Sequence, residues 1–440
     1  MYNVSGVIIM TQLDKKYVID LSKKKKEPEW MLNFRLQALE TFNEMDEPSF
    51  GPTLNIDFDK IVYYKENKNE MTDEWNKVEQ NIYGTFCDLG VVKAEQEYLY
   101  GVTNQYESEV IYHNMKDKDS GIIFTSTDDA LKKYPELFKK YFNNLVKYNE
   151  NKYTALNSAF WSGGSFIYIP KHTKLDRPLQ SYFRIDTENL GQFERTIIIV
   201  DDYAELEYIE GCTARSYSST SLHAGVVEIY VGKNASCKYS TIQNWSKDVY
   251  NLVTKRAIVE ESGFMQWIDG NVGSGVTMKY PSCILKGDYA VGNSISIAYA
   301  NADQVLDAGA KMIHIGKNTK SNIVSKSIAL NGGVSNYRGT TKITKNAINS
   351  QASIKCDTII LDPISKSDTY PDNIVNNKSS ILEHEATISK VSQEKLFYLM
   401  SKGLSEDLAK ELLIMGFISD FKHELPLEYA VELNRLLKNN

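Results

Sequence analysis

The stretch TIIIVDDYAELEYIEGCTARSYSSTSLHAGVVEIYV, residues 196–231, contains the pattern that decides the fold. Its two ends, 196–200 and 226–231, are runs of β-branched and apolar residues, which are typical of buried strands. Between them, residues 204–212 alternate apolar with polar side chains, which indicates a third strand with one buried face. Gly, Asn and Asp turns separate strands of this kind. The stretch therefore predicts short consecutive strands rather than helices.

The same pattern of short strands and turns continues from residue 165 to residue 391 and repeats with a loose period. Strand ends followed by turns recur at intervals of 26 to 31 residues, at Pro170, Val200, Val231, Val259, Leu285, Ile315 and Thr344. A period in this range, with strands in each unit, is typical of a β-solenoid whose turns stack to share one core. Leucine-rich repeats have a similar period, but their leucine–asparagine pattern is absent. We predict a mainly β protein with a right-handed β-solenoid core at residues 151–391.

Helical patterns flank the predicted solenoid on both sides. We expect an N-terminal region of helices and loops at residues 1–150, with helices near 30–42 and 128–146. The basic run at 23–26 is interpreted as a solvated stretch before a helix. For the C-terminal segment at 392–440 we expect short helices at three places, which are 393–402, 406–415 behind Ser405, and 426–437 starting at Pro426. These helices would either cap the solenoid or dock a partner.

Composition narrows the class of protein. The chain has 440 residues and a net charge of -7, so it has no excess of positive charge for binding nucleic acid as its main partner. No apolar run approaches the roughly 18–20 residues of a membrane helix, and the run at 7–10 is too short for a signal peptide. Five scattered cysteines do not suggest a disulfide framework. We therefore expect a cytoplasmic protein, or one from a plastid-type organelle.

One predicted turn separates Cys356 from the tripeptide Glu383-His384-Glu385, which lies 27 to 29 residues later. Stacked strands lie about 4.8 Å apart, so side chains on the same face of adjacent turns can reach one metal. A thiolate, an imidazole and carboxylates form a ligand set suited to iron. Because side chains alternate, Glu383 and Glu385 share one face and His384 points to the other. A regular strand therefore uses one face only, and a buried core thiol at Cys356 is the alternative interpretation.

Cys212 is the second cysteine with a predicted site, at an inward-facing position of its strand. Arg184 lies 28 residues before it and Gln243 lies 31 after it, so we expect one to stack on each side. A cation beside a thiol lowers the pKa of that thiol, so we expect Arg184 to favour the reactive thiolate of Cys212. In the alternative interpretation, Cys212 is only a small apolar residue at a turn. Five turns place Cys212 and Cys356 about 24 Å apart, so they cannot form a disulfide or share a metal. If both are functional, something has to travel between them.

The remaining cysteines and the nucleotide motifs predict no further site. Cys237 and Cys283 lie in strand patterns and are expected to be packing residues, while Cys87 is placed in a loop without a role. No Walker A sequence is present, so any use of ATP has to come from a partner.

Nine blocks of sequence, in order and over nearly the whole chain, resemble the SufB family of iron–sulfur assembly scaffolds. They are EPEWMLNFRLQAL (27–39), LNSAFWSGGSFIYIP (156–170), GQFERTIIIVD (191–201), EGCTA (210–214), STIQNW (240–245), YNLVTKRA (250–257), KMIHIGKNTKSNIVSKSI (311–328), EHEATISK (383–390) and ELPLEYAVELNRLL (424–437). The resemblance implies a non-catalytic scaffold that receives persulfide sulfur and builds a transient, nascent iron–sulfur cluster.

The resemblance also implies roles for single residues. Cys212 matches the cysteine that accepts sulfur, and Cys356 matches the site of cluster formation, with Glu383, His384 and Glu385 as nearby metal ligands. The residues that match a route between the two cysteines are Arg184, Gln243, Trp245 and Lys255. Asp186 stands where the family pattern suggests Asn, and Thr125 stands where relatives often have Cys.

The partners implied by the resemblance are the ATPase SufC, docked by the C-terminal helices, and either SufD or a second SufB copy. Sulfur would come from a cysteine desulfurase with its carrier, SufS with SufE or SufU, and participation of a flavin stays open. Two other hypotheses are a structural SufD-like subunit without its own cluster and a solenoid carbohydrate-active enzyme. The latter is disfavoured, because no secretion signal or acidic catalytic cluster is evident.

Overall fold

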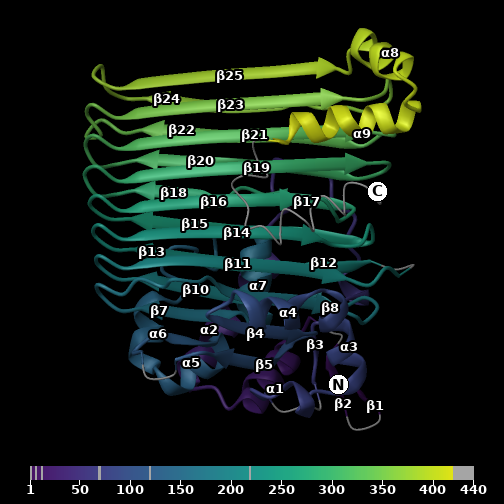
Figure 1. Cartoon of the computed structure of the whole chain (residues 1–440). Helices are drawn as coiled ribbons and strands as arrows, with labels where there is room; N and C mark the ends of the chain where they lie inside the picture. The colour runs from purple at the N-terminus through teal and green to yellow at the C-terminus, as the bar shows by residue number, and fades with distance from the viewer. Residues whose placement is uncertain are drawn as a thin grey trace.

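The computed structural model describes residues 2–4, 7–10, 13–67, 71–117, 120–217 and 220–419 of the chain. Two sheets of mostly parallel strands face each other and wind into a β-solenoid, with helices at its N-terminal end and at its last turns (Figure 1). The predicted mainly β solenoid is therefore confirmed.

One sheet carries both Cys212 and Cys356, and we call it the cysteine sheet. From the last turn of the solenoid to the N-terminal end its strands are β25 (Ile381–Lys390), β23 (Gln351–Ile360), β21 (Lys320–Leu330), β19 (Val291–Asn301), β16 (Phe264–Asn271), β14 (Ser236–Asn244), β11 (Glu205–Ala214), β8 (Leu179–Ile185), β4 (Gly101–Tyr106) and β5 (Glu109–Met115).

The opposite sheet closes the other side of the core. In the same direction its strands are β24 (Thr369–Val375), β22 (Val334–Ile343), β20 (Val305–His314), β17 (Val276–Lys279), β15 (Val249–Val259), β13 (Val226–Val231), β10 (Arg195–Val200), β7 (Ser165–Ile169) and β6 (Ile123–Ser126). Three short strands pair beside this order: β9 (Gly191–Gln192), β12 (Ser221–His223) and β18 (Ser282–Leu285).

One corner of the solenoid repeats with the same period as the strands. It contains a residue with a left-handed backbone in each turn, at intervals of 27 to 31 residues: His172, Tyr203, Asn234, Ser262, Tyr289, Asn318 and Asn349. Asn adopts this conformation readily, whereas tyrosine rarely does. The stacked corners, rather than the residue type alone, therefore impose the backbone conformation at Tyr203 and Tyr289.

The core between the sheets is built from stacked side chains at equivalent positions of successive turns. Tyr208, Tyr239 and Trp267 follow one another in register, with ring centroids 5.0 and 5.1 Å apart. Tilted aromatic pairs at this separation are favourable, so each turn contributes one ring to a continuous ladder. Cys237 and Cys283 lie in the same apolar cluster, as expected of packing residues, and Cys356 belongs to it as well.

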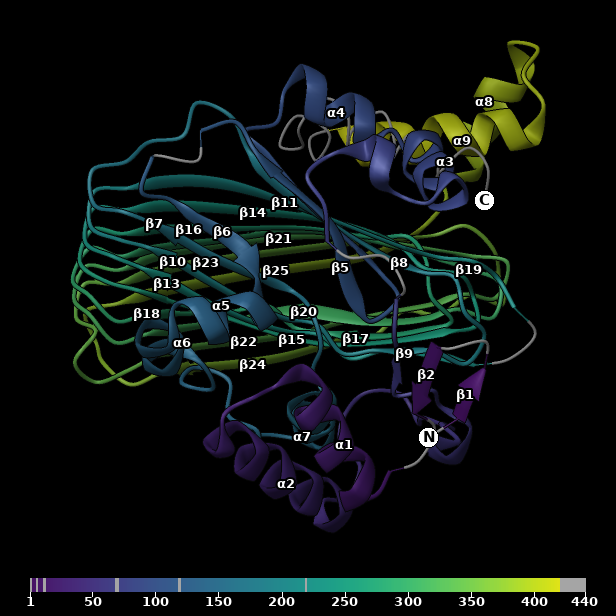
Figure 2. The same cartoon turned by 90° about the horizontal axis from the view of Figure 1, so that it is seen from below.

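Helices cover the outer faces of both sheets. The helices α3 (Gln80–Asp88), α4 (Val91–Glu97) and α9 (Glu406–Phe417) pack on the cysteine sheet and are seen in the upper part of Figure 2. The helices α1 (Lys15–Lys25), α2 (Glu29–Glu44), α5 (Thr127–Lys133), α6 (Pro135–Tyr141) and α7 (Lys152–Phe160) pack on the opposite sheet. Cys87, expected in a loop, lies in α3 with an exposed thiol.

The N-terminal region differs from the expected helices and loops because it also supplies strands. A small sheet contains β1 (Tyr2–Val4), β2 (Val7–Met10) and β3 (Tyr64–Lys65), while β4, β5 and β6 extend the two solenoid sheets. The pairs β4–β5 and β6–β7 are antiparallel. Such strands close the first turn, which would otherwise present unpaired backbone groups.

The predicted N-terminal helices are partly confirmed. The helix at 30–42 is α2, whereas the single helix expected at 128–146 divides into α5 and α6 at Tyr134, because Pro135 disfavours helical backbone before it. The basic run is solvated only in part, at Lys23 and Lys26, and Lys23–Lys25 form the last turn of α1, where they complement the helix dipole. Lys25 is buried there, and its ammonium lies 2.6 Å from the Asp128 carboxylate.

Two of the three C-terminal helices are confirmed, as α8 (Gln393–Ser401) and α9, and the Ser405 hydroxyl accepts a hydrogen bond from the Leu408 N–H at 3.3 Å. The helix expected at 426–437 lies outside the described residues. In Figure 1, α9 lies along the cysteine sheet and not across the last turn. Ile381 of β25 is 56% exposed. Within residues 392–419, the helices therefore leave this turn of the solenoid open.

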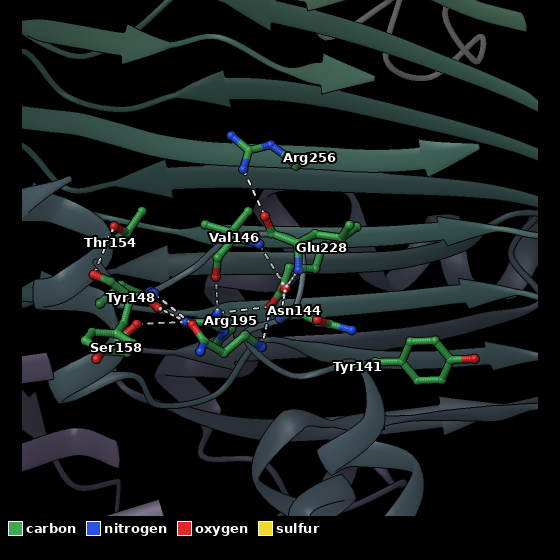
Figure 3. A network of polar contacts seen from close by, with 12 residues as sticks. Tyr141, Asn144, Val146, Tyr148, Thr154, Ser158, Arg195, Glu228 and Arg256 are labelled. Atoms are coloured by element: carbon green, nitrogen blue, oxygen red, sulfur yellow. Dashed lines mark hydrogen bonds and ion pairs between the residues drawn. The ribbon is translucent and has the colours of Figure 1, made fainter. Parts of the chain in front are cut away.

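A buried polar network fastens the segment before α7 to the solenoid (Figure 3). The backbone N–H groups of residues 143–146 donate to the Glu228 carboxylate at 2.7 to 3.1 Å. Arg195 lies 3.0 Å from the same carboxylate and donates to the Val146 carbonyl at 3.0 Å. Both charged side chains are fully buried. The Glu228 carboxylate therefore accepts hydrogen bonds from the Arg195 guanidinium and from four backbone N–H groups.

Replacing Glu228 with glutamine should lower the free energy of unfolding by about 3–5 kcal/mol, because it leaves the buried Arg195 without its counter-charge. Chemical denaturation of both proteins measures this difference. The matched control is Glu261→Gln, since the Glu261–Lys233 pair is more than half exposed and should change stability by at most about 0.5 kcal/mol. Equal losses in the two variants would contradict a structural role of the network.

Candidate functional site

A row of inward-facing side chains leads along the cysteine sheet to Cys356. The strand register places its six members one strand apart, and we call them the polar row: Glu210, Thr241, Asp269, Ser296, Ser325 and Cys356. All six are buried. The row spans five strand steps, or about 24 Å. It is therefore a continuous line of hydrogen-bonding groups inside a β-solenoid core.

A second row runs beside the polar row, two residues further along each strand. Its members are Cys212, Gln243, Asn271, Ala298, Ser327 and Thr358, and all are buried. Cys212 thus faces the interior, at the same end of the solenoid as Glu210, and Cys356 faces it five strands away. This matches the predicted five-turn separation.

Groups within the polar row bond to one another. The Thr241 hydroxyl donates to the Asp269 carboxylate at 2.6 Å, and the hydroxyls of Ser296 and Ser325 lie 3.1 Å apart. Burial of a polar group is costly unless it is hydrogen-bonded. Two of the five steps along the row are therefore direct hydrogen bonds.

Two buried lysines from the opposite sheet reach the Cys212 end of the row. Lys255 of β15 lies 3.5 Å from Glu210 and 3.7 Å from Asp269, and Lys279 of β17 lies 2.9 Å from Asp269. Burial alone would raise the pKa of Asp269, but Lys279 and Lys255 outweigh it and hold the pKa below its usual range. The interior at this end is therefore a charged cluster that bridges the two sheets.

His223 extends the charged cluster toward Trp245. Its Nε2 lies 2.6 Å from Glu194, and its ring centroid lies 4.6 Å from that of Trp245. Burial lowers the pKa of His223, but Glu194 raises it by more, which favours the charged imidazolium. The His223 Nδ1 lies 2.8 Å from Asn251, whose amide donates to Gln243 at 2.7 Å. Two of the predicted route residues, Gln243 and Trp245, therefore contact the cluster.

Sequence reasoning missed five members of this cluster: Glu194, Glu210, His223, Asp269 and Lys279. These residues could have been identified as charged residues at inward positions of a strand pattern, because a charged side chain is rarely buried unless it is paired. Their partners on the opposite sheet have no fixed spacing in the sequence.

The predicted neighbours of Cys212 are half correct. Gln243 pairs with Cys212 in the register, as expected, but Phe183 occupies the other side and Arg184 pairs with Thr213. The turn here is 29 residues rather than 28, and a shift of one residue moves a side chain to the opposite face. Arg184 instead donates to Asp186 at 3.0 Å. The extra negative charge at Asp186 is therefore compensated locally.

The expected low pKa of the Cys212 thiol is wrong for this structure. Burial and the carboxylate of Glu210 raise the pKa well above its usual value, and Lys255 and Lys279 oppose this only in part. The thiol lies 3.9 Å from the Glu210 carboxylate and can donate to it. Cys212 at rest is therefore a protonated thiol beside a proton acceptor.

The Glu-His-Glu segment lies one turn from Cys356, as predicted, in β25. Cys356 pairs with Ala386 and Ile354 pairs with His384, so Cys356 and His384 are diagonal neighbours on the inner face. Glu383 and Glu385 are exposed on the other face of the strand. The structure thus brings the histidine, and not the two carboxylates, to the side of the thiol.

The surroundings of Cys356 and His384 are mainly apolar. Burial raises the pKa of Cys356 to about 12, and the nearby Tyr337 hydroxyl opposes this shift. Burial lowers the pKa of His384, whose Nδ1 lies 3.0 Å from the Asn373 amide. Within the described ranges, no three His, Cys, Asp or Glu side chains are close enough to hold one metal ion. Cys356 and His384 are therefore at most part of a ligand set.

Alkylation of the native protein near pH 8 should modify Cys87 alone among the five cysteines. Cys87 is exposed, whereas burial raises the pKa of Cys356 to about 12 and shifts the other three in the same direction. At a pKa near 12, only about one thiol in 10,000 is ionised at pH 8. Mass spectrometry after brief iodoacetamide treatment measures the pattern. Rapid labelling of Cys356 in the folded protein would contradict the burial of this site.

Two family models match the chain. The model for the SUF system FeS cluster assembly SufBD core domain matches residues 183–417, and the model for the SufBD protein N-terminal region matches residues 17–181. No described helix has both the length and the apolar character needed to span a membrane.

Curated relatives agree with these matches. Iron–sulfur cluster assembly SufBD family proteins of Staphylococcus epidermidis, Staphylococcus saprophyticus and Staphylococcus aureus are 56% identical to this chain over 429 residues. Each alignment covers 97% of this chain and 92% of the relative. Together with the β-solenoid and its polar interior, these similarities show that the chain belongs to the SufBD family of iron–sulfur cluster assembly proteins.

Proposed function

We propose that this chain is a SufB-type scaffold, which receives persulfide sulfur at Cys212 and builds a nascent iron–sulfur cluster at Cys356. The observation that carries the proposal is the polar row, since it connects the neighbourhood of Cys212 with Cys356 through the interior. A purely structural subunit has no need of such a row, because apolar residues would pack the same space at lower cost.

Sulfur enters by exchange at Cys212. The Cys212 sulfur attacks the terminal sulfur of a protonated carrier persulfide and breaks its S–S bond. The persulfide's own proton leaves with the carrier, which departs as a thiol, and Cys212 keeps the transferred sulfur as a persulfide anion. Glu210, 3.9 Å from the Cys212 sulfur, accepts the proton that the attacking thiol loses. This transfer leaves the net charge of the buried cluster unchanged, which matters because an uncompensated charge is costly in an interior. The donors in this scheme are a cysteine desulfurase and its sulfur carrier.

Sulfur then moves along the interior to Cys356. Lys255 and Lys279 offset the charge of a persulfide anion at the entry end, and Gln243 and Trp245 border the same space. The hydroxyls of Thr241, Ser296 and Ser325 supply hydrogen bonds further along. Each sulfane sulfur needs two electrons to become sulfide, and these come from an external reductant, for which a reduced flavin is one candidate.

The cluster is the cargo of the scaffold rather than a resident cofactor. Cys356 and His384 offer a thiolate and an imidazole at the last turns, and the remaining ligands come from a second subunit, because Glu383 and Glu385 point to the other face of β25. A SufD-type chain or a second copy of this chain would supply that subunit. ATP hydrolysis belongs to a SufC-type partner, and the exposed Phe397 and Tyr398 of α8 suit its docking.

Anaerobic reconstitution with iron and sulfide tests the scaffold function. The chain co-purified with its ATPase should then show the absorption and Mössbauer spectra of an iron–sulfur cluster. No cluster under any condition, with the ATPase still bound, would show instead a structural subunit.

A substitution that obstructs the polar row should impair sulfur transfer without impairing cluster binding. Ser325→Val replaces the hydroxyl with two methyl groups, which removes the bond to Ser296 and narrows the row. It should reduce cluster formation from desulfurase-derived sulfur at least about tenfold, while overpacking costs only about 1–3 kcal/mol of stability. The matched control is Val324→Leu, which changes the adjacent, outward-facing position of the same strand. Unchanged sulfur delivery in a folded Ser325→Val protein would exclude the row as the route.

A further inference from the structure

A cavity of about 280 Å³ lies on the outer face of the opposite sheet, outside the solenoid interior. Small-molecule sites begin near this size. Its lining comes from β20, β22 and β24, from the link between β17 and β18, and from the segment after α2: Lys311, Arg338, Tyr370, Asp372, Tyr280 and Phe50. Ala310 and Met312 flank Lys311 on β20 and point into the core, so Lys311 points outward. None of these lining residues belongs to the polar row or to the charged cluster.

Lys311 is the cation of this cavity without a partner. Its ammonium lies over the rings of Phe50 and Tyr280, 5.7 and 5.6 Å from their centroids. Among the described residues it forms no ion pair or side-chain hydrogen bond, and burial and the nearby Arg256 lower its pKa. Glu150 and Asp372 oppose this shift from a distance, without forming an ion pair with Lys311. A partly buried ammonium that is not directly paired favours an incoming anion.

The two arginines near Lys311 are already paired with carboxylates. Arg256 donates to Glu150 at 2.7 Å, and the Nε of Arg338 donates to Asp307 at 2.9 Å. Tyr280 donates to the same Asp307 at 2.6 Å. These bonds fix the walls of the cavity in place, so it is largely preformed.

Flat aromatic surfaces border the cavity on two sides. The guanidinium of Arg338 lies 3.8 Å from the centroid of the Tyr370 ring, and the rings of Phe50 and Tyr280 meet edge to face at 5.8 Å. Tyr370 and Phe50 are each more than 40% exposed. Exposed rings beside a cation are suited to stacking a planar ligand.

We propose that this cavity binds a small molecule with one planar aromatic ring system and one anionic group, a phosphate or a carboxylate. The anion pairs with Lys311, and the ring lies against Tyr280 and Tyr370. Asp372 faces Thr340 at the rim, where its carboxylate repels a second anionic group and can accept from a ring N–H. A monophosphate is therefore favoured over a triphosphate.

Calorimetric titration of the full-length protein with AMP tests the site, with adenosine, inorganic phosphate and ATP as comparison probes. AMP should bind more tightly than each of the three. Lys311→Met should raise the dissociation constant for AMP at least about tenfold, and Tyr370→Ala should raise it severalfold. The matched control is Lys320→Met, an exposed lysine on the cysteine sheet, which should leave binding unchanged. Thermal unfolding of each variant verifies that it is folded.

Three results would overturn the proposal. The first is no AMP binding up to about 10 mM, a range that includes the weakest useful affinities. The second is equal AMP affinity in folded Lys311→Met and Lys320→Met. The third is inorganic phosphate binding as tightly as AMP, which would leave an anion site without ring recognition. Cluster reconstitution is measured separately, so failure here does not bear on the scaffold function.

Discussion

The Cys356→Ala protein, co-purified with its ATPase and reconstituted anaerobically with iron and sulfide, should show no iron–sulfur absorption or Mössbauer signal. Cys356 is the one inward-facing thiol at the last turns of the solenoid, among the described residues, and His384 is its diagonal neighbour. Without the thiolate, the inner face offers iron a single imidazole, which cannot hold a cluster. We therefore expect a complete loss rather than a weaker spectrum.

The matched control for this experiment is Cys283→Ala. Cys283 is also buried in the same core cluster and also has a raised pKa, but the Trp267 indole donates to its sulfur at 3.2 Å, and it lies on β18 of the opposite sheet rather than beside His384. Its loss should cost some stability and leave the cluster yield unchanged. A normal spectrum in folded Cys356→Ala would remove this cysteine from the proposed site.

The Cys212→Ala protein should form little cluster from desulfurase-derived sulfur but should form the cluster normally from free sulfide. Cluster formation from a desulfurase and its carrier should fall at least about tenfold, because the chain has lost the sulfur that attacks the carrier persulfide. Reconstitution with free sulfide should stay near the normal yield, because Cys356 lies five strands away and keeps its surroundings. Parallel measurements with both sulfur sources separate entry from assembly.

Cys237→Ala is the control for Cys212→Ala, because Cys237 is equally buried in β14 but lies in the apolar part of the core. It should behave normally with both sulfur sources. Equal yields from desulfurase-derived sulfur in Cys212→Ala and Cys237→Ala would place sulfur entry elsewhere. Loss of both yields in Cys212→Ala would indicate a role of Cys212 in folding rather than in transfer.

The solenoid could be predicted because its cause is local and repeated. Each turn needs a buried strand and a corner, so strand ends at 26- to 31-residue intervals are visible in the sequence. The strands β4 and β6 were missed because they join the sheets from another part of the chain. Whether such short segments become strands depends on which sheet edge needs covering, and sequence patterns do not contain that information.

The site was predictable where strand alternation alone decides the geometry. Alternation placed Cys212 inward and set His384 opposite to Glu383 and Glu385, and the structure has them so. Arg184 was misplaced because the turn lengths vary, and an error of one residue moves a side chain to the other face. The polar row depends on the exact length of five successive turns, so approximate spacing could not reveal it.

The sequence by itself thus determined the class of fold, the inward orientation of Cys212 and the resemblance to the SufBD family. Only the tertiary structure decided how Lys255 and Lys279 of one sheet meet Glu210 and Asp269 of the other. Pairing within a sheet follows the repeat along the chain, whereas pairing across the core depends on how the two sheets pack, because those contacts have no fixed separation in sequence.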